Sequence, residues 1–131
     1  MKPNILCIED HPDNMTLVRR ILQAESYNLI EARTGNQGLS LAESKEVDLI
    51  LLDINLPDID GYEVARRVRA STNEHLAHIP IIALTANAMK GDAQKALGAG
   101  CTIYMAKPIN IQDLMDKVEK LTSEVSKGNG S

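Results

Sequence analysis

Aromatic side chains are scarce in this sequence, which contains three tyrosines and no phenylalanine or tryptophan. Nucleic-acid bases and flavins are held largely by stacking on aromatic rings, so the sequence offers little platform for either ligand. The net charge is −4, and no Lys/Arg cluster offsets the 18 acidic residues. A phosphate backbone would be repelled by such a chain, and we therefore expect no direct binding of nucleic acid.

Cysteine and long apolar runs are also scarce. Cys7 and Cys101 lie far apart, and neither belongs to a C-x-x-C pair or has histidine at metal-ligand spacing. No stretch approaches the roughly 18 apolar residues of a membrane-spanning helix, and the first residues do not resemble a secretion signal. We therefore expect buried free thiols, no membrane association and a cytoplasmic location.

The length of 131 residues is typical of one domain and too short for two independent hydrophobic cores. Residues 126–131 are polar and glycine-rich, which is typical of disorder. The sequence predicts a domain over residues 1–125 and a disordered tail over 126–131.

Short apolar runs alternate with segments of helical spacing along the chain. We expect strands near residues 5–8, 28–32, 48–53, 79–84 and 102–105, and helices beginning near residues 12, 35, 61, 92 and 111. The helix near 92 is expected to end with Gly98 as a left-handed cap, and Arg69 is expected on an outer helix face. This alternation predicts a doubly wound α/β domain with a five-stranded parallel sheet, in the flavodoxin-like order 2-1-3-4-5, and five helices.

Polar residues follow the expected strands. They are Glu9 and Asp10 after the first strand, Asp53 after the third, Thr85 after the fourth and Lys107 after the fifth. The carboxyl ends of parallel strands share one edge of the sheet, so these side chains are expected to converge there. Carboxylates that lie close together repel one another, and a hard divalent ion such as Mg²⁺ or Mn²⁺ would relieve this repulsion.

Asp53 could act in this setting as a nucleophile on a phosphoryl group and form an acyl phosphate. Lys107 and Thr85 could bind the phosphoryl oxygens. Each residue also has an ordinary interpretation, since a single acid can cap a helix and a single lysine can lie on the surface. The combination at one sheet edge favours a functional site.

Four segments carry a family resemblance. They are Ile8-Glu9-Asp10, the run from Leu52 to Gly61, Ala83-Leu84-Thr85-Ala86 and Lys107-Pro108. In this order they resemble the receiver domain of two-component response regulators, over residues 3–122.

The resemblance implies that Asp53 accepts a phosphoryl group from a histidine kinase or a phosphotransfer protein. It implies that Mg²⁺ is held by Asp10, Asp53 and the backbone carbonyl of Asn55, with Glu9 helping through water. It also implies that Thr85 and Lys107 bind phosphoryl oxygens.

The resemblance further implies a conformational switch. Tyr104 would turn inward as Thr85 moves toward the phosphate, and the Lys107-Pro108 peptide would be cis. Asn55 and Asn87 would tune the lifetime of the phosphate. A downstream protein, or a second copy of the chain, would bind the face made by the helix near 92, the strand near 102–105 and the last helix.

Several alternatives remain open. The chain could be the receiver of a hybrid histidine kinase or of a multidomain regulator, or a scaffold that is never phosphorylated. An enzyme is disfavoured: Asn55 stands where a haloacid-dehalogenase-type phosphatase needs a second Asp, and no G-x-x-x-x-G-K-[ST] motif is present. A flavodoxin would need aromatic walls and a phosphate loop after the first strand, where Glu9 and Asp10 stand. We expect a phosphoacceptor signalling domain that is not an enzyme.

Overall fold

The computed structural model describes residues 2–86 and 91–130. One parallel sheet contains β1 (Asn4–Ile8), β2 (Asn28–Ala32), β3 (Leu49–Asp53), β4 (Ile81–Thr85) and β5 (Ile103–Ala106). The described helices are α1 (Pro12–Ala24), α2 (Gly35–Ser44), α3 (Gly61–Arg69), α4 (Glu74–His78), α5 (Asp92–Gly98) and α6 (Ile111–Gly130). The strand order is β2-β1-β3-β4-β5, so the predicted fold class and topology are confirmed.

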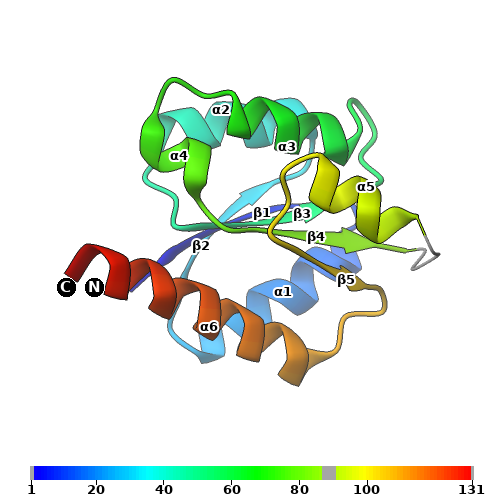
Figure 1. Cartoon of the computed structure of the whole chain (residues 1–131). Coiled ribbons are helices and arrows are strands. Elements are labelled where there is room, and N and C mark those ends of the chain that lie inside the picture. Colours follow the sequence, from blue (N-terminus) through cyan, green and yellow to red (C-terminus); the bar gives the residue numbers. More distant parts are fainter. Residues whose placement is uncertain (1, 87–90, 131) are drawn as a thin grey trace.

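The sheet separates two hydrophobic cores (Figure 1). Helices α2, α3, α4 and α5 cover one face, and α1 and α6 cover the other. Every residue of β3 is buried, and its side chains alternate between the two faces of the sheet. Leu52 packs in the core under α2, α3, α4 and α5, and Leu51 packs in the core under α1 and α6. The unbroken apolar run in the sequence therefore reflects a central strand that is covered on both faces.

Helix α4 was not predicted from the sequence. It has five residues, too few for a helical period to be recognised, and it begins where the Asn73 side chain accepts a hydrogen bond from Leu76 N–H. Ile79 closes this helix, so β4 begins after Pro80 at Ile81, two residues later than expected. The helix count is therefore six in the described residues, against five predicted.

The end of α5 also differs from the prediction. Gly98 is the last helical residue, and Gly100 adopts the left-handed conformation, with φ of 107°. Ala99 continues in the right-handed region, which moves the reversal to the second glycine.

Arg69 turns inward instead of lying on the outer face of α3. Its guanidinium donates hydrogen bonds to the carbonyl oxygens of Gly100 at 2.8 Å, Ala77 at 3.1 Å and Ile79 at 2.7 Å. Burial lowers the pKa of Arg69 from its ordinary value. This side chain joins the end of α3 to α4 and to the turn before β5.

Helix α6 ends at Gly130. The domain boundary at residue 125 and the disordered tail over residues 126–131 stay predictions. Within the described residues, none of the helices has the length and apolar character needed to cross a membrane.

Candidate functional site

Polar side chains from four strands meet at one edge of the sheet. Asp53 is the last residue of β3 and Thr85 the last of β4, while Glu9 follows β1 and Lys107 follows β5. The backbone continues the ladder here, because Lys107 N–H donates to the carbonyl oxygen of Thr85 at 2.8 Å. The short apolar strands thus carry the polar residues at their ends to a common place, as the sequence predicts.

Lys107 lies between two buried carboxylates. Its Nζ is 3.0 Å from Glu9 Oε1 and 3.2 Å from Asp53 Oδ1. Glu9 is 1% exposed and Asp53 is 2% exposed, so both carboxylates are shielded from bulk water. Asn55 N–H donates to Asp53 Oδ1 at 3.0 Å, and His11 N–H donates to Glu9 Oε2 at 3.1 Å. One ammonium group therefore serves both acids.

This sharing changes the protonation of the site. Burial, together with the neighbouring Glu9, raises the pKa of Asp53 to about 7, although Asn55 N–H and Lys107 act in the other direction. Burial also disfavours ionised Glu9, but the neighbouring Asp53, Lys107 and His11 N–H favour its charged form more strongly and lower the pKa of Glu9. Burial favours neutral Lys107, yet contacts with the two acids raise the pKa of Lys107. Without a further cation, the site holds one proton more readily than two free carboxylates would.

The acidic residues fit a bound cation. Glu9, Asp10 and Asp53 each offer a carboxylate oxygen, and these atoms lie within 4.8 Å of one another. Glu9 Oε1 is buried and, in the described part of the chain, accepts no well-oriented hydrogen bond besides its ionic contact with Lys107. Carboxylate oxygens without nearby imidazole or thiolate suit a hard divalent ion.

The other predicted site residues have definite places. Thr85 is 5% exposed at the end of β4, and Tyr104 on β5 is 37% exposed, so Tyr104 is partly open to solvent. The Lys107-Pro108 peptide is cis, as predicted. Asn87 lies outside the described residues, and the roles assigned to Thr85 and Tyr104 stay predictions.

Comparison with known proteins identifies the family. The model of the response regulator receiver domain matches residues 5–119. This chain belongs to the response regulator receiver family. The polar-differentiation response regulator DivK of Brucella ovis is 39% identical over 119 residues, which cover 91% of this chain and 95% of that protein. The chain is thus a receiver domain of the kind found in two-component signalling.

Solved structures resemble this receiver closely. The receiver domain of a sensor histidine kinase from Pseudomonas aeruginosa, determined with magnesium coordinated in its active site cleft, is 36% identical, with a TM-score of 0.85. That match covers 94% of this chain and 99% of the other. A response-regulator receiver of Saccharomyces cerevisiae, crystallised with a histidine phosphotransfer signalling protein, is 27% identical, with a TM-score of 0.86. The matched region covers 93% of this chain and 90% of that receiver chain.

Two residues beside the site belong to the run from Leu52 to Gly61 that carries the family resemblance, but the sequence indicates no contact for either of them. A Cβ atom on Gly61 would lie 2.6 Å from the backbone oxygen of Asp53, so α3 approaches the site closely only because this position is glycine. Asp58 bonds to the start of α2, 22 and 23 residues earlier in the chain. The spacing Asp53…Pro57…Gly61 is part of the family resemblance and marks the glycine, whereas no local pattern marks the partner of Asp58.

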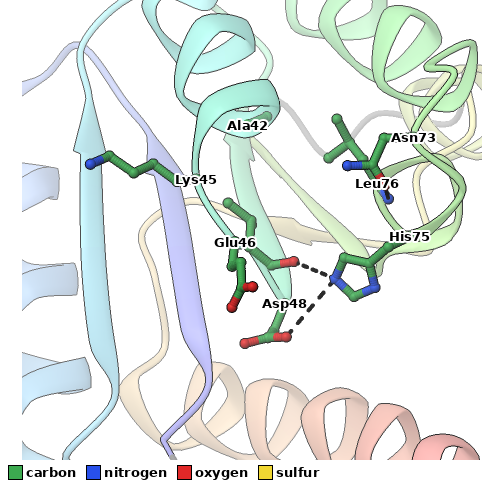
Figure 2. Close-up of a pocket in the computed structure, with 8 residues that line it drawn as sticks. Ala42, Lys45, Glu46, Asp48, Asn73, His75 and Leu76 are labelled. Atoms are coloured by element: carbon green, nitrogen blue, oxygen red, sulfur yellow. Dashed lines mark hydrogen bonds and ion pairs between the residues drawn. The ribbon is translucent and has the colours of Figure 1, made fainter.

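A separate pocket of about 380 Å³ lies at the other end of β3, between the α2–β3 connection and α4. Figure 2 shows His75 pointing from α4 toward the chain before β3. Its Nε2 is 2.8 Å from the carbonyl oxygen of Val47 and 4.0 Å from Asp48 Oδ1. This contact ties α4 to the sheet, at the edge opposite the acidic cluster.

Proposed function

We propose that Asp53 is the phosphoacceptor of this receiver and that the transfer depends on Mg²⁺. The observation that carries the proposal is the shielded Asp53 carboxylate, which lies 3.2 Å from Lys107 Nζ inside a cluster of three acids. A buried carboxylate beside a lysine and a cation-binding cluster is suited to attack a phosphoryl group.

In the proposed reaction, a carboxylate oxygen of Asp53 attacks the phosphorus of a phosphohistidine on a histidine kinase or phosphotransfer protein. The new O–P bond forms as the P–N bond breaks, and the bonding electron pair stays on the donor histidine nitrogen. Lys107 and Thr85 bind phosphoryl oxygens and offset their charge. The reaction needs ionised Asp53, so a change that lowers the raised pKa of this carboxyl favours it.

The residues proposed to hold Mg²⁺ are Asp10, Asp53 and the backbone carbonyl of Asn55, with Glu9 acting through water. The ion would supply positive charge at an edge where three acids meet one lysine. We propose that the domain assists its own phosphorylation and dephosphorylation and acts as a signalling module, not as an enzyme with a separate substrate. Mn²⁺ has similar ligand preferences and is proposed to substitute.

The proposed output is a change in protein binding at the face of α5, β5 and α6. Among the described residues, large apolar side chains are well exposed at Leu97 on α5, Tyr104 on β5 and Ile111 on α6, at 52%, 37% and 51%. These exposed apolar side chains on adjoining elements support the proposal that this face binds a protein. Phosphorylated Asp53 would draw Thr85 inward, allow Tyr104 to follow and alter this face, which could also bind a second copy of the chain.

A cytoplasmic location is part of the proposal, because Cys7 and Cys101 are both buried free thiols. A second candidate keeps the same chemistry but places this receiver within a hybrid histidine kinase. It is favoured by the 36% identity to the kinase receiver from Pseudomonas aeruginosa. The coding sequence around this domain would distinguish the two arrangements.

The test is intact-mass measurement after incubation with acetyl phosphate and Mg²⁺. We expect the gain of one phosphoryl group, and we expect that gain to be lost in Asp53→Asn and in EDTA. A control variant, Asp113→Asn, removes an exposed acid on α6 and should be labelled like the wild type. Absence of labelling in the wild type, or equal labelling of Asp53→Asn, would overturn the proposal.

A further inference from the structure

The start of α2 is held by a residue from a distant loop. The first N–H groups of a helix have no partner within it and must be satisfied from outside. Thr34 is the N-cap, and its Oγ1 accepts from Gln37 N–H at 3.0 Å. The two preceding donors, Gly35 N–H and Asn36 N–H, each bond to one carboxylate oxygen of Asp58 at 2.8 Å.

Asp58 lies in the middle of the connection between β3 and α3. The ends of that connection are fixed by other bonds, since Ile54 N–H donates to the carbonyl oxygen of Leu84 at 3.0 Å and Asp60 caps α3. Asp58 holds the segment between them against α2. The carboxylate accepts both bonds at once, so it restrains the loop in rotation as well as in distance.

The sequence of α2 accommodates this loop. A Cβ atom on Gly35 would lie 2.5 Å from Ile59 Cγ1 and 3.0 Å from Val64 Cγ2, so the glycine lets the loop approach the helix start. The positive end of the helix dipole also favours a carboxylate at this place. The Asn36 N–H, with a smaller contribution from Gly35 N–H, lowers the pKa of Asp58, which keeps the acceptor ionised near neutral pH.

The same loop carries a proposed part of the site. Asn55, three residues before Asp58, donates its N–H to Asp53 Oδ1 at 3.0 Å, and its carbonyl oxygen is a proposed metal ligand. Binding sites need their ligands held within about 0.5 Å of the productive position, and the loss of a group that orients a ligand typically weakens metal binding about 10- to 100-fold.

We propose that Asp58 is a positioning residue that fixes the β3–α3 loop against the start of α2 and so sets the Asn55 backbone for metal binding. This inference rests on the proposed function, because it concerns the same site. Asp58 need not touch the ion or the phosphoryl group. It acts by holding the β3–α3 loop through its two hydrogen bonds to the start of α2.

The test compares Asp58→Ala with Thr34→Ala in the full chain. Both variants remove acceptors from the start of α2, but Asp58→Ala alone frees the loop. Binding of Mg²⁺ is measured by titration calorimetry, and stability by urea unfolding. We expect both variants to be less stable, while the dissociation constant for Mg²⁺ rises about tenfold in Asp58→Ala and less than about twofold in Thr34→Ala.

A third variant, Asp58→Asn, keeps one carbonyl oxygen as an acceptor and covers the case in which Asp58→Ala fails to fold. We expect a rise in the dissociation constant that is smaller than that of Asp58→Ala. An unchanged dissociation constant in both Asp58 variants, or equal rises in Thr34→Ala and Asp58→Ala, would overturn the inference. Wild-type protein that is not labelled by acetyl phosphate would overturn the proposed function itself, which separates the two failures.

Discussion

Replacing Gly61 with alanine tests how closely α3 approaches the candidate site. The added Cβ would lie 2.6 Å from both the carbonyl oxygen of Asp53 and the Cα of Ile54. These are backbone atoms of a buried strand end, so they cannot rotate away as a flexible side chain could. Gly61 N–H also donates to the carbonyl oxygen of Ile54 at 2.9 Å, and this bond opposes outward movement of the helix.

Overpacking of this kind costs about 1–3 kcal/mol of unfolding free energy. Urea unfolding of a small domain has a slope of about 1–3 kcal/mol per molar, so a loss of about 2 kcal/mol lowers the midpoint by roughly 1 M. The same displacement moves Asp53, and we expect labelling by acetyl phosphate to slow as well.

The matched control is Gly98→Ala. A Cβ on Gly98 meets no atom within 4 Å, and the residue is helical, so alanine there should add about 0.5–1 kcal/mol of stability. Both variants are measured by urea unfolding and by mass after acetyl phosphate treatment. A midpoint for Gly61→Ala equal to or above that of the wild type would refute the steric argument.

Three further predictions concern other contacts. In EDTA, the pKa of Asp53 is about 7 in the folded chain and near 3.8 in the unfolded chain. The stabilisation from protonated Asp53 is therefore lost as pH rises between these values. In urea unfolding, the free energy of unfolding of Asp53→Asn should rise relative to that of the wild type across this interval. Arg69→Met should lower the free energy of unfolding by at least about 1.5–3 kcal/mol, because carbonyl groups lose a charged donor. Arg67→Met, at an exposed ion pair, should lower it by about 0.3–0.5 kcal/mol. Equal losses in denaturant unfolding would contradict this account. His75→Ala should cost about 0.5–1.5 kcal/mol in thermal unfolding through its lost bond to the α2–β3 connection, and His78→Ala, whose imidazole bonds within α4, should cost less.

The strands and the positions of the site residues could be predicted because their signals are local. The apolar run before Asp53 indicates a strand covered on both faces, and its bounds differ from the structure by a single residue. The alternation of strands and helices then restricts the topology, and the topology brings Asp53 beside Lys107 although 54 positions separate them. The sequence pattern therefore predicts which side chains lie at the carboxyl edge of the sheet, but not the distances between them.

Features that depend on distant partners could not be predicted in this way. Arg69 has the spacing of an outward residue, but carbonyl groups of α4 and of the turn at Gly100 accept its hydrogen bonds inside the protein. Gly98, the last residue of α5, and Gly100 both permit the left-handed conformation, and the structure uses Gly100. The contact of Asp58 with α2 is likewise set by the tertiary fold and by no local pattern.

The sharing of Lys107 connects the resting site to the proposed switch. In the structure this ammonium serves Glu9 and Asp53 together. A phosphoryl group on Asp53 would present more negative charge and more acceptor oxygens than the carboxylate does, so it would compete with Glu9 for Lys107. Glu9 is buried, and its Oε1 accepts no well-oriented hydrogen bond among the described residues. If Lys107 moved away, the buried Glu9 carboxylate would be left without a compensating charge, which is unfavourable unless a cation binds nearby. The acidic cluster is therefore suited to a task beyond the transfer itself, because a cation bound there could balance Glu9 while Lys107 turns to the phosphoryl group.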